Sequence, residues 1–178
     1  LSNTAYEGET ISFRGSFTDP GLLDTHTFEW EFGDGTTVAG LLDPSHVYID
    51  DGIYVVTLMV TDSEGDVGTA SLDMTIVNRP PSVSLGPDRL VSEGEVTALI
   101  AQVSDPGQLD AHTFHWQFAP GEVVTGGSNV SYTFFDDGIY TVTVDVQDDD
   151  GGSGFASMSV TVQNEPPVAD AGPDMTAD

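Results

Sequence analysis

Aspartates stand at matching places in two halves of the chain, in loop-forming sequences such as Asp-Pro-Gly. The matching pairs, 86 residues apart, are Asp19 and Asp105, Asp24 and Asp110, and Asp62 and Asp148. Carboxylate oxygens gathered from loops are the ligands that Ca²⁺ prefers, in sets of about six to eight oxygens completed by backbone and water. The residue types and their recurrence therefore point to calcium binding as the chemistry that these residues could carry.

Acidic residues dominate the whole chain of 178 residues, with 30 Asp and Glu against 3 Arg and a formal net charge of −27. Phosphate backbones and anionic bilayers repel such a chain, so we expect no nucleic-acid partner and no direct membrane insertion. The absence of Cys excludes disulfides, Fe–S clusters, thiolate zinc sites and cysteine nucleophiles. Hydrophobic residues make up 38% of the chain, which is enough for folded cores. The longest apolar stretch, around residues 53–60, is far too short to span a bilayer.

Two copies of one unit make up most of the chain, and they align at an offset of 86 residues without a gap. Segments that recur are Glu7-Gly8-Glu9 as Glu93-Gly94-Glu95, His26-Thr27-Phe28 as His112-Thr113-Phe114, Asp50-Asp51-Gly52-Ile53-Tyr54 as Asp136-Asp137-Gly138-Ile139-Tyr140, and Asn78-x-Pro80-Pro81 as Asn164-x-Pro166-Pro167. We therefore predict one domain over 1–79, a second over 80–165, and over 166–178 the linker and first strand of a third copy. That third start, with Leu1 in place of Met, indicates a processed product or a fragment of a longer array.

Each copy alternates apolar and polar residues with a period of two, which predicts β-strands. In the first copy the apolar set includes Phe28, Trp30 and Phe32, then Tyr54, Val56, Leu58 and Val60, then Ala70, Leu72, Met74 and Ile76. Gly, Pro and Asp clusters separate the runs, and no segment has a helical period. The pattern predicts an all-β protein of two tandem β-sandwiches with about seven strands each. The Pro-Pro linkers restrict φ and favour a semi-rigid rod.

Three motifs in the first copy carry a resemblance to a known family. They are Trp30-Glu31-Phe32-Gly33-Asp34-Gly35, Asp51-Gly52-Ile53-Tyr54-Val55-Val56, and Val60-Thr61-Asp62 followed by Gly65. Together they resemble the PKD (polycystic kidney disease) domain of bacterial and archaeal surface proteins, and the resemblance covers both copies nearly end to end. It implies immunoglobulin-like (PKD-type) sandwiches that are extracellular, act as spacers or interaction modules, are rarely catalytic and in some cases bind calcium near the start of the domain. The second copy departs at Ala119-Pro120-Gly121, where it lacks the Gly-Asp of the signature.

The strand order of such a sandwich predicts which acidic loops share an end. The loops after the second and sixth strands meet near the point where the Asn78 linker enters the second copy. Across that linker they face the end of the first copy that carries Glu7, Glu9, Asp34, Asp50 and Asp51. Converging carboxylates repel one another, and Ca²⁺ would reverse that repulsion. The proposed ligands are Asp19, Asp24 and Asp62 in the first copy, and Asp105, Asp110 and Asp148 in the second, with Asn78 or backbone carbonyls of the linker. The alternative is that Asp-Pro-Gly and Asp-Asp-Gly are ordinary turns and that the acidity serves solubility in salt.

Other residues with chemical potential have structural interpretations. His26 and His112 are expected to hydrogen-bond to a neighbouring Asp. Trp30 and Trp116 are expected to anchor the cores, and Tyr54 and Tyr140 to act as tyrosine corners. No sequence context of a nucleophile or a catalytic triad occurs, so we predict no enzyme activity.

The function that fits these observations is that of a non-catalytic spacer, stalk or adhesion module of an extracellular, repeat-containing surface protein, with Ca²⁺ stiffening the domain junctions. A first alternative is a self-assembling fibre subunit, in which residues 166–178 add a strand to a neighbouring molecule. A second is a module that binds carbohydrate or protein. The partners expected are neighbouring repeats of the same chain, other protein copies or surface polysaccharide.

Overall fold

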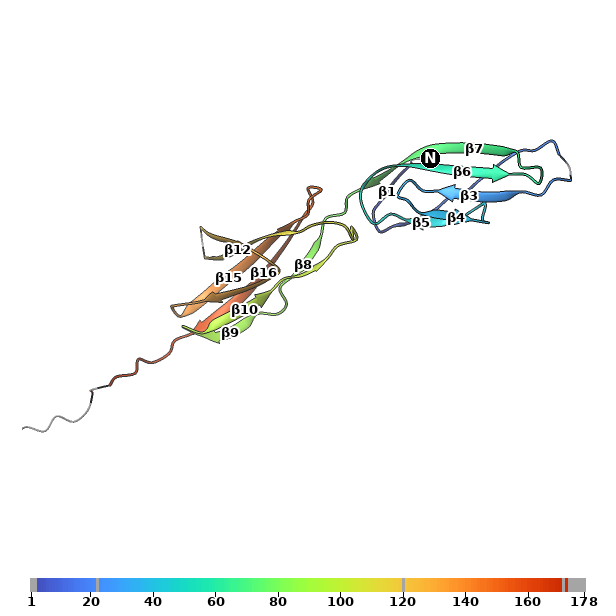
Figure 1. Cartoon of the computed structure of the whole chain (residues 1–178). Helices are drawn as coiled ribbons and strands as arrows, with labels where there is room; N and C mark the ends of the chain where they lie inside the picture. Colours follow the sequence, from blue (N-terminus) through green and yellow to red (C-terminus); the bar gives the residue numbers. More distant parts are fainter. Residues whose placement is uncertain (1–2, 22, 120, 171, 173–178) are drawn as a thin grey trace, which may run out of the picture. The chain divides into compact units, whose positions relative to one another are not determined.

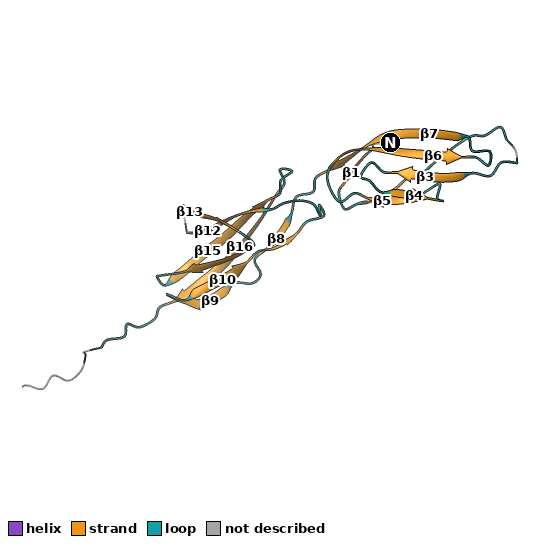
Figure 2. Ribbon diagram, in the orientation of Figure 1, coloured by secondary structure: helices purple, strands orange, loops and turns teal. Residues whose placement is uncertain are grey.

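The computed structural model describes residues 3–21, 23–119, 121–170 and 172, and within those ranges it contains strands and turns but no helix (Figure 2). The prediction of an all-β protein is confirmed. Accordingly, no helix in these ranges is long and apolar enough to cross a membrane.

The first repeat forms a five-stranded sheet in the order β1-β7-β6-β3-β4 and a small sheet of β2 and β5. Its strands are β1 (Thr4–Tyr6), β2 (Thr10–Ser12), β3 (Thr27–Glu31), β4 (Thr37–Ala39), β5 (Ser45–Val47), β6 (Gly52–Thr61) and β7 (Val67–Val77). The long antiparallel pair of β6 and β7 forms the centre of the larger sheet (Figure 1). The short strand β1 joins β7 in parallel, which places Glu7 beside the end of β7.

The second repeat has an equivalent five-stranded sheet in the order β13-β12-β15-β16-β9, with the two-stranded sheets β10-β14 and β11-β8 opposite. Its strands are β8 (Ser82–Ser84), β9 (Arg89–Ser92), β10 (Val96–Ile100), β11 (Gln102–Ser104), β12 (Thr113–Ala119), β13 (Glu122–Gly126), β14 (Asn129–Thr133), β15 (Gly138–Gln147) and β16 (Ser153–Gln163). The strands β12, β15 and β16 are the counterparts of β3, β6 and β7 at the repeat offset of 86 residues. Residues 166–170, predicted to begin a third copy, are described but form no strand, and residues 171 and 173–178 lie outside the described ranges.

Apolar side chains on the inward phase of each strand form the cores. In the first repeat the buried cluster consists of Phe13, Trp30, Phe32, Tyr48, Val56, Leu58, Met74 and Ile76. In the second repeat Trp116, Val142, Val144 and Val160 are completely buried. The prediction that both Trp residues are core anchors is confirmed.

Leu72, which the alternation places in the first core, is more exposed than predicted, at 37%, whereas its counterpart Met158 is only 4% exposed.

The chain divides into two compact units whose bounds differ from those of the repeats. The first unit comprises Leu1–Ser82 together with Ser104–Thr113 and Val146–Gly154, and the second comprises Val83–Val103, Phe114–Asp145 and Phe155–Asp178. Two acidic loops of the second repeat therefore belong to the same unit as the first repeat. This first unit contains most of the candidate site residues.

Candidate functional site

A group of three carboxylates lies within the first unit. One oxygen each from Glu7, Asp105 and Asp110 lies within 4.8 Å of the others. Glu7 follows β1, and the two aspartates belong to the loop at 104–113. Sequence reasoning placed both aspartates in a metal site but did not include Glu7 among the ligands.

Glu7 is a carboxylate with no solvent exposure, at 0%. Its Oε1 accepts a hydrogen bond from the backbone N–H of Arg79 at 2.7 Å, while its Oε2 is buried and has no hydrogen-bond partner. Burial raises the pKa of Glu7, and the negative charge of Asp105 adds to that rise. A signal for this residue existed in the sequence, because Glu7 continues the inward phase of Ala5 along the strand.

Asp110 is the second member of this group with unused oxygens. Both of its carboxylate oxygens are buried and without a hydrogen-bond partner. Burial, with the charges of Glu7 and Asp105, raises the pKa of Asp110 to about 6. Asp110 also belongs to a second group, with Asp50 and Asp150, that obeys the same 4.8 Å limit. Carboxylates of both groups therefore surround the side chain of Asp110.

The third member, Asp105, is held in place by its own loop. His112 Nε2 lies 2.7 Å from Asp105 Oδ2, and the backbone N–H of Gly107 donates to Oδ1 at 3.1 Å. The first repeat has the same arrangement, with His26 at 2.7 Å from Asp19. The prediction that these histidines bond to a neighbouring Asp is confirmed.

His46 forms a third pair of this kind, which the sequence did not predict because His46 has no histidine counterpart in the second repeat. Its Nε2 lies 2.7 Å from Asp34, in the Gly-Asp-Gly turn of the family signature. The ring also stacks on Phe32 at 4.2 Å. In the second repeat Tyr132 takes its place and stacks on Phe118 at 4.1 Å, so this pair has a packing role.

Asp148 and Asn78, both predicted as ligands, bond to each other. Asn78 Nδ2 donates to Asp148 Oδ2 at 3.0 Å. The other oxygen, Oδ1, accepts the backbone N–H groups of Asp150 and Gly152 at 3.1 and 2.6 Å. Asp148 belongs to none of the carboxylate groups found among the described residues. The two carboxylate oxygens of Asp148 therefore accept hydrogen bonds from the linker and from the loop that contains Asp148.

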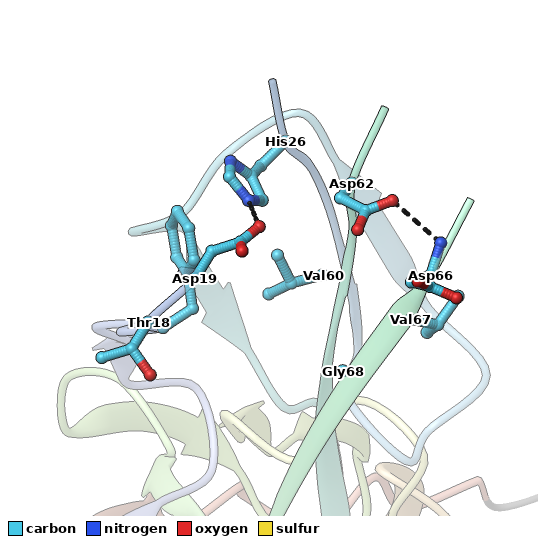
Figure 3. A pocket seen from close by; sticks show the side chains of 9 residues that line it. Thr18, Asp19, His26, Val60, Asp62, Asp66, Val67 and Gly68 are labelled. Carbon is cyan, nitrogen blue, oxygen red and sulfur yellow. Dashed lines mark hydrogen bonds and ion pairs between the residues drawn. The ribbon is translucent and has the colours of Figure 1, made fainter. Parts of the chain in front are cut away.

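The first repeat gathers its own predicted ligands. Carboxylate oxygens of Asp19, Asp24 and Asp62 lie within 4.8 Å of one another. Beside them is an open pocket of about 250 Å³ lined also by His26 and Asp66 (Figure 3). Figure 3 shows Asp19 bonded to His26 on one side and Asp62 accepting the backbone N–H of Asp66 on the other, at 2.9 Å. Burial and the charge of Glu64 raise the pKa of Asp24.

An equivalent of the Glu7 group exists in the second repeat, in a more open form. Glu93 lies with Asp136 and Asp137, and both aspartates are exposed. Glu93 Oε1 accepts the backbone N–H of Glu165 at 2.9 Å, as Glu7 does from Arg79. No Asp-Pro-Gly loop among the described residues covers Glu93, which remains partly exposed.

The family model of the PKD domain matches residues 2–76 and 78–162, which together make up most of the chain. The chain belongs to the PKD domain family. Tyr54 and Tyr140 fit the sandwich of this family, because each hydroxyl donates to a backbone carbonyl of the preceding turn, that of Asp50 at 3.1 Å and that of Asp136 at 3.0 Å.

The PKD pair is similar to segments of much longer proteins. It is 30% identical over 168 residues to the Dyslexia-associated protein KIAA0319 homolog of Rattus norvegicus, covering 83% of this chain and 15% of the relative. It is 30% identical over 116 residues to Collagenase ColA of Bacillus cereus, covering 64% of this chain and 12% of the relative. The chain thus spans less than a sixth of these relatives. Among solved structures, the Sidekick-1 immunoglobulin domains 1-5 align over 91% of this chain and 37% of that chain, with 17% identity and a TM-score of 0.43.

Membership in this family supports an extracellular module of a kind that is typically non-catalytic. The expectation of two tandem PKD-type, immunoglobulin-like sandwiches is confirmed.

Proposed function

We propose that this PKD pair is a non-catalytic spacer or stalk of an extracellular repeat protein. Its stiffness depends on the side-chain contacts that hold the linker 78–81 in place. The observation that carries the proposal is the hydrogen bond from Asn78 to Asp148, because it ties the linker to a loop of the repeat that follows. A linker held by side chains transmits orientation from one repeat to the next, whereas a free linker acts as a hinge.

Further contacts within the first unit support a fixed linker. The backbone N–H of Gln108 donates to the carbonyl of Ile49 at 2.9 Å. The guanidinium of Arg79 lies 2.7 Å from Glu9 and over the ring of Tyr6. Gly152 packs closely on Pro80, since a Cβ placed on Gly152 would lie 2.9 Å from the Cα of Pro80.

We propose calcium as the cofactor that stiffens this linker. The ligand sets are Asp19, Asp24 and Asp62 in the first repeat, and Asp105 and Asp110 with Asn78 and Asp148 nearby in the second. Ca²⁺ bound to loops on either side of a linker stabilises the one arrangement in which all ligands reach it. The partners in this role are neighbouring repeats of the same chain.

Small-angle X-ray scattering of the chain with Ca²⁺ and with chelator tests this function. We expect a narrower distribution of interatomic distances, with an unchanged or longer maximum dimension, when Ca²⁺ is present. The Asn78→Ala variant should give a broader distribution of interatomic distances than wild type in both conditions. Asn164→Ala, the matched change in the second linker, should leave the distribution unchanged. Equal flexibility of wild type and Asn78→Ala would contradict the proposal.

A second candidate is assembly by strand addition, in which an extended segment such as residues 166–170 pairs with a strand of another copy. Analytical ultracentrifugation showing only monomers at all concentrations would exclude this candidate. A third candidate function is the binding of polysaccharide or of another protein. A glycan array tests the polysaccharide part.

A further inference from the structure

Glu7 has an unusual combination of properties for a carboxylate. It has no solvent exposure, its Oε2 is buried without a hydrogen-bond partner, and one of its oxygens lies within 4.8 Å of oxygens of two further carboxylates. A buried charge without a partner costs several kcal/mol, and proteins meet that cost by pairing the charge or by binding an ion.

Basic side chains of the chain do not balance this charge. Within the described residues, the ion pairs link His26, His46 and His112 with Asp19, Asp34 and Asp105, and Arg79 with Glu9. The side chain of Arg89 donates to the carbonyl of Ala98. Neither Glu7 nor Asp110 takes part in any of these ion pairs.

The geometry of the group suits one cation. Two oxygens on the same Ca²⁺ can be no farther apart than twice the metal–oxygen distance, which is about 4.6–5.2 Å. The oxygens of Glu7, Asp105 and Asp110 meet this limit, at 4.8 Å or less. The bond from His112 to Asp105 fixes one ligand from behind, as hydrogen bonds to ligating carboxylates do in metal sites.

We propose that a divalent cation of the Ca²⁺ class binds between Glu7, Asp105 and Asp110, with Glu7 as its buried anchor. An oxygen of Asp110 also lies within 4.8 Å of oxygens of Asp50 and Asp150, whose charges attract the ion without being required ligands. Water and backbone carbonyls complete the coordination. Asn78 and Asp148 lie outside this site, because their side chains satisfy each other.

This inference refines the calcium part of the proposed function and rests on it only there. It also explains why one turn sequence, Glu-Gly-Glu, differs between its two occurrences. Glu7 meets an Asp-Pro-Gly loop and becomes a buried ligand, whereas Glu93, with no such loop among the described residues, is partly exposed. A complete site therefore needs one Glu-Gly-Glu turn and the Asp loop of the following repeat.

Calorimetric titration of the chelator-treated full chain with CaCl₂, at physiological salt, tests the proposal through two matched pairs of variants. Glu7→Gln keeps the shape and the acceptor for Arg79, and Glu93→Gln is the same change 86 residues on. Asp110→Asn is paired with Asp73→Asn, the same change at an exposed position of β7 that belongs to no proposed ligand set. We expect Glu7→Gln and Asp110→Asn to weaken the tightest Ca²⁺ binding by about tenfold or more, because each removes a charged ligand, and the two controls to change it less than about twofold.

Each other outcome has a definite meaning. Equal effects of all four variants would mean non-specific attraction to the acidic surface and would overturn the site. No Ca²⁺ binding to the wild type would overturn both the site and the calcium part of the proposed function. If Asp148→Asn abolished binding while Glu7→Gln did not, the proposed function would stand and the Glu7 site would be wrong. Amide NMR spectra without Ca²⁺ establish that each variant is folded.

Discussion

Glu7 and Glu93 stand at equivalent positions of the two repeats and hold the chain in the same way, yet their surroundings differ. Each accepts the backbone N–H of the residue that follows the linker Asn, at 2.7 Å from Arg79 and 2.9 Å from Glu165. Glu7 is then sealed by the loop at 104–113 and is fully buried, whereas Glu93 stays partly exposed beside two exposed aspartates. The difference teaches that the acidic turn becomes a concentrated charge site only when an Asp-Pro-Gly loop closes over it.

The largest expected effect comes from the glycine beside each glutamate. Gly8 has φ of 72°, and a Cβ there would lie 2.7 Å from the Cβ of Pro106; Gly94 has φ of 78° and nothing within 4 Å. Gly94→Ala should cost about 1–2 kcal/mol for the left-handed backbone alone. Gly8→Ala should cost about 2–5 kcal/mol, since overpacking against Pro106 is added.

Differential scanning calorimetry of both glycine variants measures this contrast. The loop at 104–113 should also become detached in Gly8→Ala, visible as faster amide hydrogen exchange at Gln108. Equal losses of stability in the two variants would show that the loop does not pack on Gly8 in solution.

Calcium should stabilise the chain through Glu7 and not through Glu93. At a Ca²⁺ concentration a hundred times the dissociation constant, linkage predicts about 2.7 kcal/mol of added stability. Thermal unfolding with Ca²⁺ and with chelator should show this gain in wild type and Glu93→Gln. Glu7→Gln should keep no more than about 1.4 kcal/mol of it, because its binding is weaker by tenfold or more. A full gain in Glu7→Gln would place the stabilising ion elsewhere.

The linker asparagines form another matched pair. Asn78 donates to the carboxylate of Asp148, while the counterpart Asn164 is exposed. A hydrogen bond to a charged group contributes about 1.5–3 kcal/mol, so Asn78→Ala should lose about 1.5 kcal/mol and Asn164→Ala almost none. Chemical denaturation followed by tryptophan fluorescence measures the free energy of unfolding of both variants. A comparable loss in Asn164→Ala would show that the bond from Asn78 to Asp148 does not distinguish the two linkers.

The smallest expected effect is a pH dependence that Asp110 contributes without calcium. Its pKa of about 6 lies above the ordinary value of 3.8, because burial and neighbouring charges favour the protonated form. The folded chain therefore binds this proton more tightly than the unfolded chain, and the contribution of Asp110 to stability grows as the pH falls through 6 and is lost as it rises. With chelator, unfolding measured between about pH 5 and 7 should show this slope in wild type and a smaller one in Asp110→Asn; identical slopes would contradict the assignment.

The fold could be predicted because its signals are local. Alternation of period two identifies the strands, and the repeat offset shows that the pattern occurs twice. Leu72 is an exception, because alternation shows the phase of a side chain along a strand and not how completely the neighbouring elements cover it.

The site could be predicted only in part. Asp105 and Asp110 share a loop, so their proximity follows from spacing. Glu7 is distant in sequence from both, and its burial arises when the Asp loop packs on its turn. Asp148 as a ligand stays a prediction; two backbone N–H groups and Asn78 donate hydrogen bonds to its oxygens, and these donors could not be predicted from the acidic run.

The most direct test of the central claim, that Glu7 anchors a cation with Asp105 and Asp110, is anomalous X-ray diffraction from crystals of the chain grown with Ca²⁺ or Tb³⁺. We predict an anomalous peak between these three side chains, at about 2.3–2.6 Å from Glu7 Oε2. Peaks at the exposed groups around Asp24 or Glu93, with none beside Glu7, would contradict it.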